Sequence, residues 1–96
     1  MKARFHPLAR REIADAFEHY ELATLGLGAK FRERVRQITQ LLCDFPRIAP
    51  KIPKGVRQIS IPRFPYQLIY TVTAEEVFIL AVAHKRKKPG YWQGRS

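Results

Sequence analysis

The stretch that decides the fold is residues 66–83, YQLIYTVTAEEVFILAVA. Its first part, residues 66–72, is rich in aromatic and β-branched side chains, which is typical of a β-strand. Its last part, residues 77–83, is apolar at every position, as expected of a central strand that is covered on both faces. The polar residues Thr73 to Glu76 lie between the two parts. We therefore predict two strands joined by a turn, and we interpret Glu75 and Glu76 as solvating charges of that turn.

Two helical patterns lie upstream of these strands. The first begins at Pro7, a residue suited to the first turn of a helix, and the second ends at Pro46. In both, apolar residues recur with the spacing of one buried stripe. The residues predicted to be buried are Ile13, Ala16, Phe17 and Tyr20 in the first helix, and Phe31, Val35, Ile38, Leu42 and Phe45 in the second. Those off the first stripe, which we predict to be solvated, are Glu12, Asp15, Glu18 and His19.

A turn and two shorter strands complete the pattern. Gly26-Leu27-Gly28 breaks the helical periodicity, so we expect the two helices to form a tight antiparallel hairpin. Residues 3–5 and residues 56–61 have the character of strands, the latter with Ile59 and Ile61 on one face. The order β-α-α-β-β-β predicts one α+β domain over residues 1–96. We expect an antiparallel sheet with the helical hairpin packed on one face.

The charge of the chain is its most informative bulk property. The sequence holds 18 Lys and Arg against 8 Asp and Glu, which gives a net charge of +10. Residues 1–44 carry eight basic and six acidic residues, whereas residues 45–96 carry ten basic and two acidic ones. We therefore expect the second half to meet a polyanionic partner: nucleic acid, a nucleic-acid machine or an acidic protein.

The sequence lacks the residue patterns of several common kinds of functional site. The three histidines have no ligand-like spacing with one another or with Cys43, so no metal site is expected. Neither serine lies in a nucleophile-elbow context and no glycine-rich phosphate loop precedes a helix, so no cofactor is predicted. The single cysteine suits a reducing compartment, and the longest apolar run is far too short to span a bilayer. We expect a cytoplasmic protein that does not contact a membrane.

The basic tail, residues 84–96, places four consecutive cations next to two large aromatic side chains. Cations bind phosphate, and an aromatic side chain can stack on a base or fill an apolar pocket of a partner. In the alternative interpretation, Trp92 folds back over the sheet and the cations are solvated. The predicted target-binding residues are Lys85, Arg86, Lys87, Lys88, Tyr91, Trp92 and Arg95.

The same region also offers the parts of a metal-free ribonuclease. Cleavage of RNA by its own 2′-hydroxyl needs a base, an acid and cations around the crowded phosphate. His84 and Tyr91 could exchange the protons. The cations that could neutralise the phosphate are Arg63, Lys85 and Arg86. Any basic domain offers such a set, so these residue types alone do not assign the chemistry.

Four short motifs, in their order and spacing, make the chain resemble the RelE/ParE toxin superfamily over nearly its whole length. They are Pro7-Leu8-Ala9 with Ile13 to Tyr20; Gly26-Leu27-Gly28 with Phe31 and the closing Phe45-Pro46; Arg63-Phe64-Pro65-Tyr66-Gln67-Leu68-Ile69-Tyr70; and Val82-Ala83-His84-Lys85-Arg86 with Pro89, Tyr91-Trp92 and Arg95. The resemblance implies the toxin of a type II toxin–antitoxin system. It also implies a cognate acidic antitoxin as partner, with operator DNA contacted only through that antitoxin.

The superfamily divides by target. RelE-type toxins cut mRNA on the ribosome, whereas ParE-type toxins poison DNA gyrase without being nucleases. By register from the tyrosine-rich strand, the cations of the ribonuclease branch fall on Gln58, Ser60 and Gln67 of this sequence. Lys85 stands in place of a later arginine, and only Tyr91 matches the branch outright. Loss of a charge-stabilising donor costs roughly 10²–10³ in rate, which disfavours the RelE mechanism.

The resemblance therefore favours a ParE-like toxin that arrests growth by binding DNA gyrase and has no catalytic residues of its own. The alternative is a ribosome-dependent, metal-independent mRNA endoribonuclease that uses His84, Arg86 and Tyr91, since Arg57 and Arg63 flank the vacated positions. A third class is a remnant of the toxin fold that binds only its antitoxin or DNA.

Overall fold

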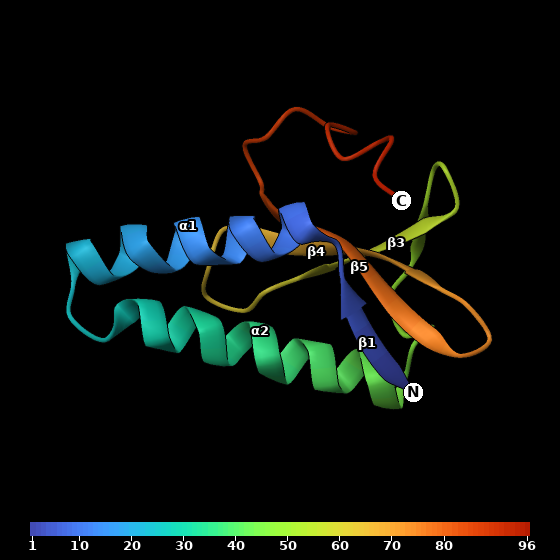
Figure 1. The fold of residues 1–96 in the computed structure, drawn as a ribbon, viewed down its shortest axis with the longest axis horizontal. Helices are drawn as coiled ribbons and strands as arrows, with labels where there is room; N and C mark the ends of the chain where they lie inside the picture. The colour runs from blue at the N-terminus through green and yellow to red at the C-terminus, as the bar shows by residue number, and fades with distance from the viewer.

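Two helices and a five-stranded sheet make up the computed structural model, which describes residues 1–96 (Figure 1). In chain order the elements are β1 (Lys2–Phe5), α1 (Pro7–Ala23), α2 (Leu27–Asp44), β2 (Lys51–Ile52), β3 (Val56–Ser60), β4 (Tyr66–Val72) and β5 (Glu76–His84). The strands lie in the order β1-β5-β4-β3-β2. The predicted α+β class and the order of the longer elements are confirmed.

The sheet differs from the prediction in two ways. It is mixed, because β1 pairs in parallel with β5, its neighbour at the far end of the sequence. It also gains the short strand β2, which pairs with β3 within the proline-rich connection. The apolar pattern of residues 3–5 predicts a strand but does not specify its partner, and a two-residue strand has no periodicity to detect.

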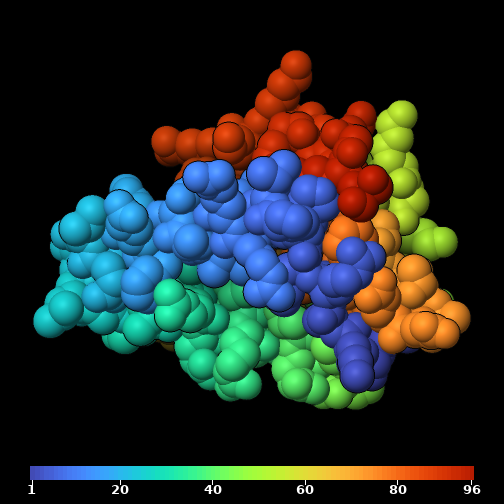
Figure 2. Space-filling model, viewed as in Figure 1, coloured from blue at the N-terminus to red at the C-terminus, as the bar shows by residue number.

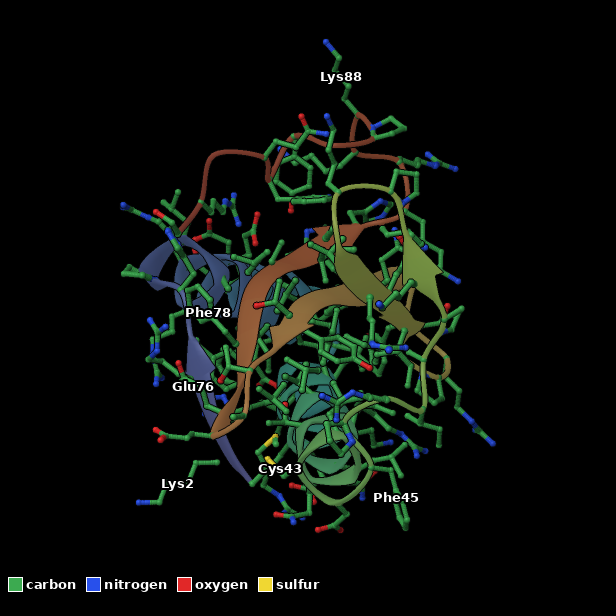
Figure 3. The ribbon with its side chains drawn as sticks, turned by 90° about the vertical axis from the view of Figure 1, so that its right-hand side faces the viewer. Lys2, Cys43, Phe45, Glu76, Phe78 and Lys88 are labelled. Atoms are coloured by element: carbon green, nitrogen blue, oxygen red, sulfur yellow. The ribbon has the colours of Figure 1, made fainter.

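The helical hairpin covers one face of the sheet, as predicted. Its buried residues and the strand residues that face it form one core cluster, in which Phe31, Val35 and Leu42 of α2 meet Leu68 and Tyr70 of β4. In the view of Figure 3, α2 lies on one side of the sheet and the C-terminal tail on the other. The sheet is therefore covered on both faces.

A carboxylate and a glycine form the tight turn of the hairpin. The Glu21 side chain accepts hydrogen bonds from the backbone nitrogens of Gly26, Gly28 and Ala29 at 3.1, 2.9 and 3.3 Å. These groups would otherwise lack partners at the start of a helix, and their hydrogen bonds lower the pKa of Glu21. Gly28 belongs to α2 and not to the predicted turn; a Cβ there would lie 2.5 Å from the Phe17 carbonyl oxygen.

The prediction that Phe45 is buried is wrong. Phe45 caps the C-terminus of α2 with φ −135° and ψ 72°, so its backbone has already left the helix. Its side chain is 60% exposed and lies near the exposed Ile48. The buried stripe of α2 therefore ends at Leu42.

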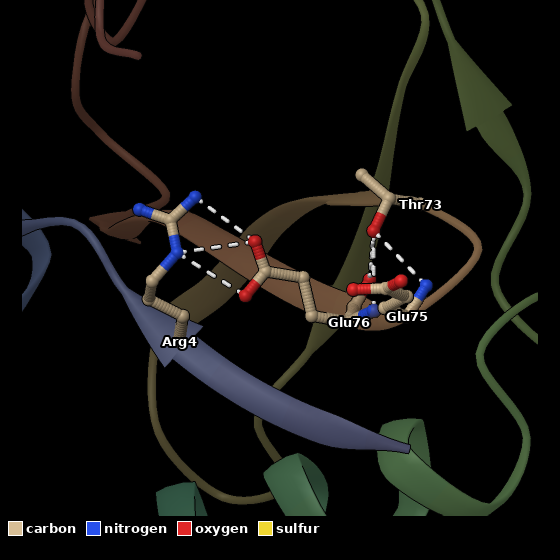
Figure 4. A network of polar contacts seen from close by, with 4 residues as sticks. All are labelled: Arg4, Thr73, Glu75 and Glu76. Atoms are coloured by element: carbon tan, nitrogen blue, oxygen red, sulfur yellow. Dashed lines mark hydrogen bonds and ion pairs between the residues drawn. The ribbon is translucent and has the colours of Figure 1, made fainter.

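The turn between β4 and β5 makes specific polar contacts, although its two glutamates were predicted only to be solvated. Thr73 Oγ1 accepts hydrogen bonds from the nitrogens of Glu75 and Glu76 at 3.3 and 3.1 Å (Figure 4). The Glu76 carboxylate pairs with the Arg4 guanidinium at 3.0 Å, and that guanidinium lies 3.8 Å from the centre of the Phe78 ring. Glu76 therefore links β5 to β1, whereas Glu75 is exposed as predicted.

Candidate functional site

The tail folds back onto the outer face of the sheet, the face away from the helical hairpin. Trp92 is 8% exposed there, which decides between the two interpretations of this residue in favour of packing on its own domain. It belongs to a second apolar cluster, whose other buried members are Val56, Ile69, Phe78, Leu80, Ala81 and Ala83. Figure 2 shows the tail lying against the first part of α1.

An irregularity in β5 explains why the tail is needed. Ile69 is opposite Ala81 and Tyr70 is opposite Ile79, so Leu80 is an extra residue, a β-bulge. On its other side β5 loses its partner after Phe5, because β1 ends where Pro7 begins α1. The Leu80 carbonyl and the Val82 N–H thus face an open edge, and a buried backbone group without a partner is costly.

Glu12 and Arg95 supply the missing partners. The Glu12 carboxylate accepts a hydrogen bond from Val82 N at 3.0 Å, and Arg95 Nη1 donates to the Leu80 oxygen at 2.9 Å. Arg95 also pairs with Glu12 at 3.0 Å, and the two side chains are only 12% and 19% exposed. The Tyr91 hydroxyl donates to the same carboxylate at 2.6 Å. We call Glu12, Tyr91 and Arg95 the tail clasp.

The contacts of the tail clasp raise the pKa values of two of its groups, Tyr91 and Arg95. Burial, reinforced by the hydrogen bond to Glu12, raises the pKa of the Tyr91 hydroxyl well above its ordinary value. The hydrogen bond from Arg95 to Glu12 raises the pKa of the guanidinium, so Arg95 holds its charge more firmly than a free arginine. The Tyr91 phenol is consequently a poor proton donor to any outside group.

The interpretation of Glu12 as solvated is wrong. Ala9 and Ala16 are the fully covered residues of α1, and Glu12 lies three residues after the first and four before the second, on the same face. Two alanines on that face allow α1 to approach β5 closely. The two alanines are the feature of the sequence that could have located the buried face of α1. The prediction instead centred that face on the larger apolar residues Ile13, Phe17 and Tyr20, which are all half-buried.

The side chains of the basic part of the tail make no hydrogen bond or ion pair, although the Lys87 ammonium lies 5.2 Å from the centre of the Tyr91 ring. Lys85, Arg86, Lys87 and Lys88 are exposed, and Lys88 points away from the body in Figure 3. Lys85 N donates to the Pro65 oxygen at 2.8 Å, which fixes the start of the segment beside the turn between β3 and β4. The predicted target-binding residues therefore divide into exposed cations and a packed set of Tyr91, Trp92 and Arg95.

The residues of the alternative ribonuclease reading are only partly linked by hydrogen bonds. His84 packs its ring edge-on against Tyr66 at 5.0 Å, and its Nδ1 accepts a hydrogen bond from Arg86 N at 3.0 Å. Tyr91 is engaged by Glu12, and no hydrogen bond links it to His84. Arg63 is exposed in the turn between β3 and β4. No hydrogen bond therefore couples the predicted acid and base directly.

Gln58, Ser60 and Gln67, the positions where the resemblance places the ribonuclease cations, lie close together on the sheet. Ser60 lies directly opposite Gln67, and Gln58 opposite Ile69, a residue of the outer-face cluster. Their side chains therefore share the outer face of the sheet. Arg57, which flanks them, lies opposite Tyr70 on the other face and donates to the Ala49 oxygen at 2.6 Å. It cannot replace a cation on the outer face without giving up that bond.

No group of three His, Cys, Asp or Glu side chains is placed to hold a metal ion. No helix combines the length and the apolar composition that crossing a membrane would require.

The element order and the basic C-terminal tail are those that the resemblance to the RelE/ParE superfamily predicts. The chain belongs to the ParE family: the model described as "ParE toxin of type II toxin-antitoxin system, parDE" matches residues 3–89. Membership implies a cognate antitoxin. Tyr91, Trp92 and Arg95 lie beyond the matched range.

The fold is shared with a solved structure described as the chromosomal ParDE TA system from P. aeruginosa. The TM-score is 0.65 at 19% sequence identity, over 88% of this chain and 95% of that chain. The search of curated proteins gave no significant match.

Proposed function

We propose that the chain is a toxin that arrests growth by binding DNA gyrase, and that a cognate acidic antitoxin neutralises it in the cytoplasm. The observation that carries the proposal is that the neutral residues Gln58, Ser60 and Gln67 stand together on the outer face, at the positions where the resemblance places the cations of the ribonuclease branch. Neutral amides and a hydroxyl cannot compensate the charge that develops on a phosphate during cleavage. Membership of the ParE family supports the same conclusion.

The state of Tyr91 also argues against phosphate cleavage. The ribonuclease reading needs this phenol to lend its proton to a leaving oxygen. Its proton is instead directed at Glu12, 2.6 Å away, and its pKa is raised by burial. An acid of raised pKa that already donates to a carboxylate contributes little to proton transfer near neutral pH.

The exposed cations Lys85 to Lys88 are the proposed contact with gyrase. They follow β5 directly, so the sheet holds the start of the segment in place. Four adjacent charges would steer association and make it sensitive to salt. Tyr91, Trp92 and Arg95 complete the proposed binding region by holding this segment in position, because their own side chains are engaged with the body of the domain.

Induction of the toxin in cells tests the proposal. Gyrase inhibition should give filamentous cells and induce the DNA-damage response, while translation continues at first and mRNA shows no new codon-specific ends. Co-expression of the antitoxin should abolish these effects. Immediate arrest of translation with new mRNA ends, lost in Tyr91→Phe or His84→Ala, would instead assign the chain to the ribonuclease branch.

A further inference from the structure

A second basic surface lies between α2 and the turn that joins β3 to β4. It is a cleft of about 640 Å³. The side chains that matter are Tyr20, Lys30, Arg34, Gln37, Arg63 and Phe64. In Figure 1 the yellow β3–β4 turn reaches the space beside the two helices, where these segments meet. We call this the hairpin cleft.

The cations of the hairpin cleft have no partners within the chain. The ion pairs of the structure involve Arg4, Arg36 and Arg95, so Lys30, Arg34 and Arg63 are unpaired. Glu33 is the one carboxylate at the cleft, and both its oxygens are held by Arg36, the nearer contact at 2.6 Å. The cleft therefore carries uncompensated positive charge, which favours an anionic ligand.

The turn between β3 and β4 holds Arg63 at the wall of the cleft in an unusual backbone conformation. Its φ is +70°, a left-handed conformation that a residue with a Cβ seldom adopts. Prolines at positions 62 and 65 restrict the turn on both sides. Backbone strain of this kind persists where the surroundings enforce it and is common at binding sites. On the other wall, Arg34 is half-buried and projects from a regular helix.

The floor of the cleft is aromatic. Tyr20 and Phe64 lie 5.1 Å apart in an edge-to-face pair, and both are only half-buried. The Tyr20 hydroxyl makes no hydrogen bond within the chain and is not sealed from solvent. A planar face, a free hydroxyl and guanidinium groups are the groups that proteins use on an unpaired base and its phosphates.

From these contacts we propose that the hairpin cleft binds the phosphodiester backbone of a nucleic acid and accepts one unpaired nucleotide on its aromatic floor. An acidic peptide could pair with the same cations but offers no base to stack beside Tyr20 and Phe64. Lys85 lies beside the same turn and extends the charged surface toward the tail. Backbone contacts carry no sequence information, so this is not operator recognition.

Binding of labelled oligonucleotides to the full-length toxin, followed by fluorescence anisotropy over a range of salt, tests the proposal. The probes are single-stranded DNA, single-stranded RNA, duplex DNA and a polyglutamate peptide of equal charge. The double variant Arg34→Gln with Arg63→Gln removes two cleft cations. Its matched control, Lys2→Gln with Arg47→Gln, removes two exposed cations that lie elsewhere.

We expect single strands to bind more tightly than the duplex or the peptide. The cleft variant should raise the Kd about tenfold at low salt and reduce the salt slope by about one to two contacts, while the control barely changes either. Tyr20→Phe should weaken binding without changing the salt slope. Equal losses in the cleft and control variants, or tighter binding of polyglutamate than of any oligonucleotide, would overturn the proposal. Thermal melts of each variant separate loss of binding from loss of folding.

Discussion

Glu12→Gln should destabilise the protein far more than its position on an exposed helix suggests. The change keeps the size of the side chain and one oxygen that can still accept from Val82 N. It removes the charge that faces Arg95 at 3.0 Å and Tyr91 at 2.6 Å. Arg95, whose side chain is 12% exposed, is left as a covered cation without a counter-charge.

The magnitude follows from the burial of the clasp. Breaking a fully buried ion pair costs about 3–5 kcal/mol, and a hydrogen bond to a charged group contributes about 1.5–3 kcal/mol. Since the pair is partly reached by solvent and Gln keeps one acceptor, we expect a loss of about 2–3 kcal/mol. In a domain of this size that lowers Tm by roughly 10–20 °C.

Thermal melts and the fluorescence of Trp92, the only tryptophan, measure the effect. In Glu12→Gln the Trp92 emission should shift to the red and become easier to quench, because the tail that carries it loosens. Glu18→Gln, an exposed carboxylate on the same helix, is the control and should stay within about 0.5 kcal/mol of the parent. A parent-like melt and a buried Trp92 in Glu12→Gln would refute the clasp.

Three further predictions concern Trp92, Gly28 and the four tyrosines. Trp92→Ala should cost about 3–5 kcal/mol in denaturant unfolding, because its ring fills the outer-face cluster; a parent-like midpoint would mean that the tail does not pack there. Gly28→Ala should cost about 1–3 kcal/mol, since the new Cβ would meet the Phe17 carbonyl oxygen at 2.5 Å, and unchanged stability would show that the helices separate freely. All four tyrosines have a raised pKa, chiefly through burial, so the folded state keeps phenol protons that the unfolded chain releases near pH 10. Stability should therefore be unaffected by these groups below about pH 10 and fall above it, with phenolate absorbance appearing at unfolding; early titration of all four in the folded protein would contradict this.

The fold could be predicted from the sequence because its main signals are local. The apolar run of residues 77–83 is a central strand covered on both faces, and the stripe from Phe31 to Leu42 is buried as expected. The parallel partner of β1 could not be predicted, since no local pattern encodes a pairing across more than seventy residues. The exposure of Phe45 depends on where the helix ends, which periodicity locates poorly.

The site was predicted less completely. Its residue types, the cations and aromatic side chains of the tail, are evident in the sequence, but their separate roles are not. Whether Trp92 meets a partner or its own sheet depends on how the tail is held at the edge of β5 that β1 leaves open. Glu12, from the other end of the chain, accepts a hydrogen bond at the same open edge. A polar residue that completes a distant backbone edge has no pattern of its own in the sequence.

DNA supercoiling by purified gyrase tests the central claim most directly. Toxin freed from its antitoxin should inhibit the reaction at stoichiometric concentrations, and the antitoxin should restore activity. A variant with Lys85 to Lys88 changed to Gln should melt normally yet lose the inhibition, whereas Lys51→Gln with Lys54→Gln should inhibit like the parent. If the parent toxin leaves supercoiling untouched at concentrations that arrest cells, gyrase is not its target and the account is wrong.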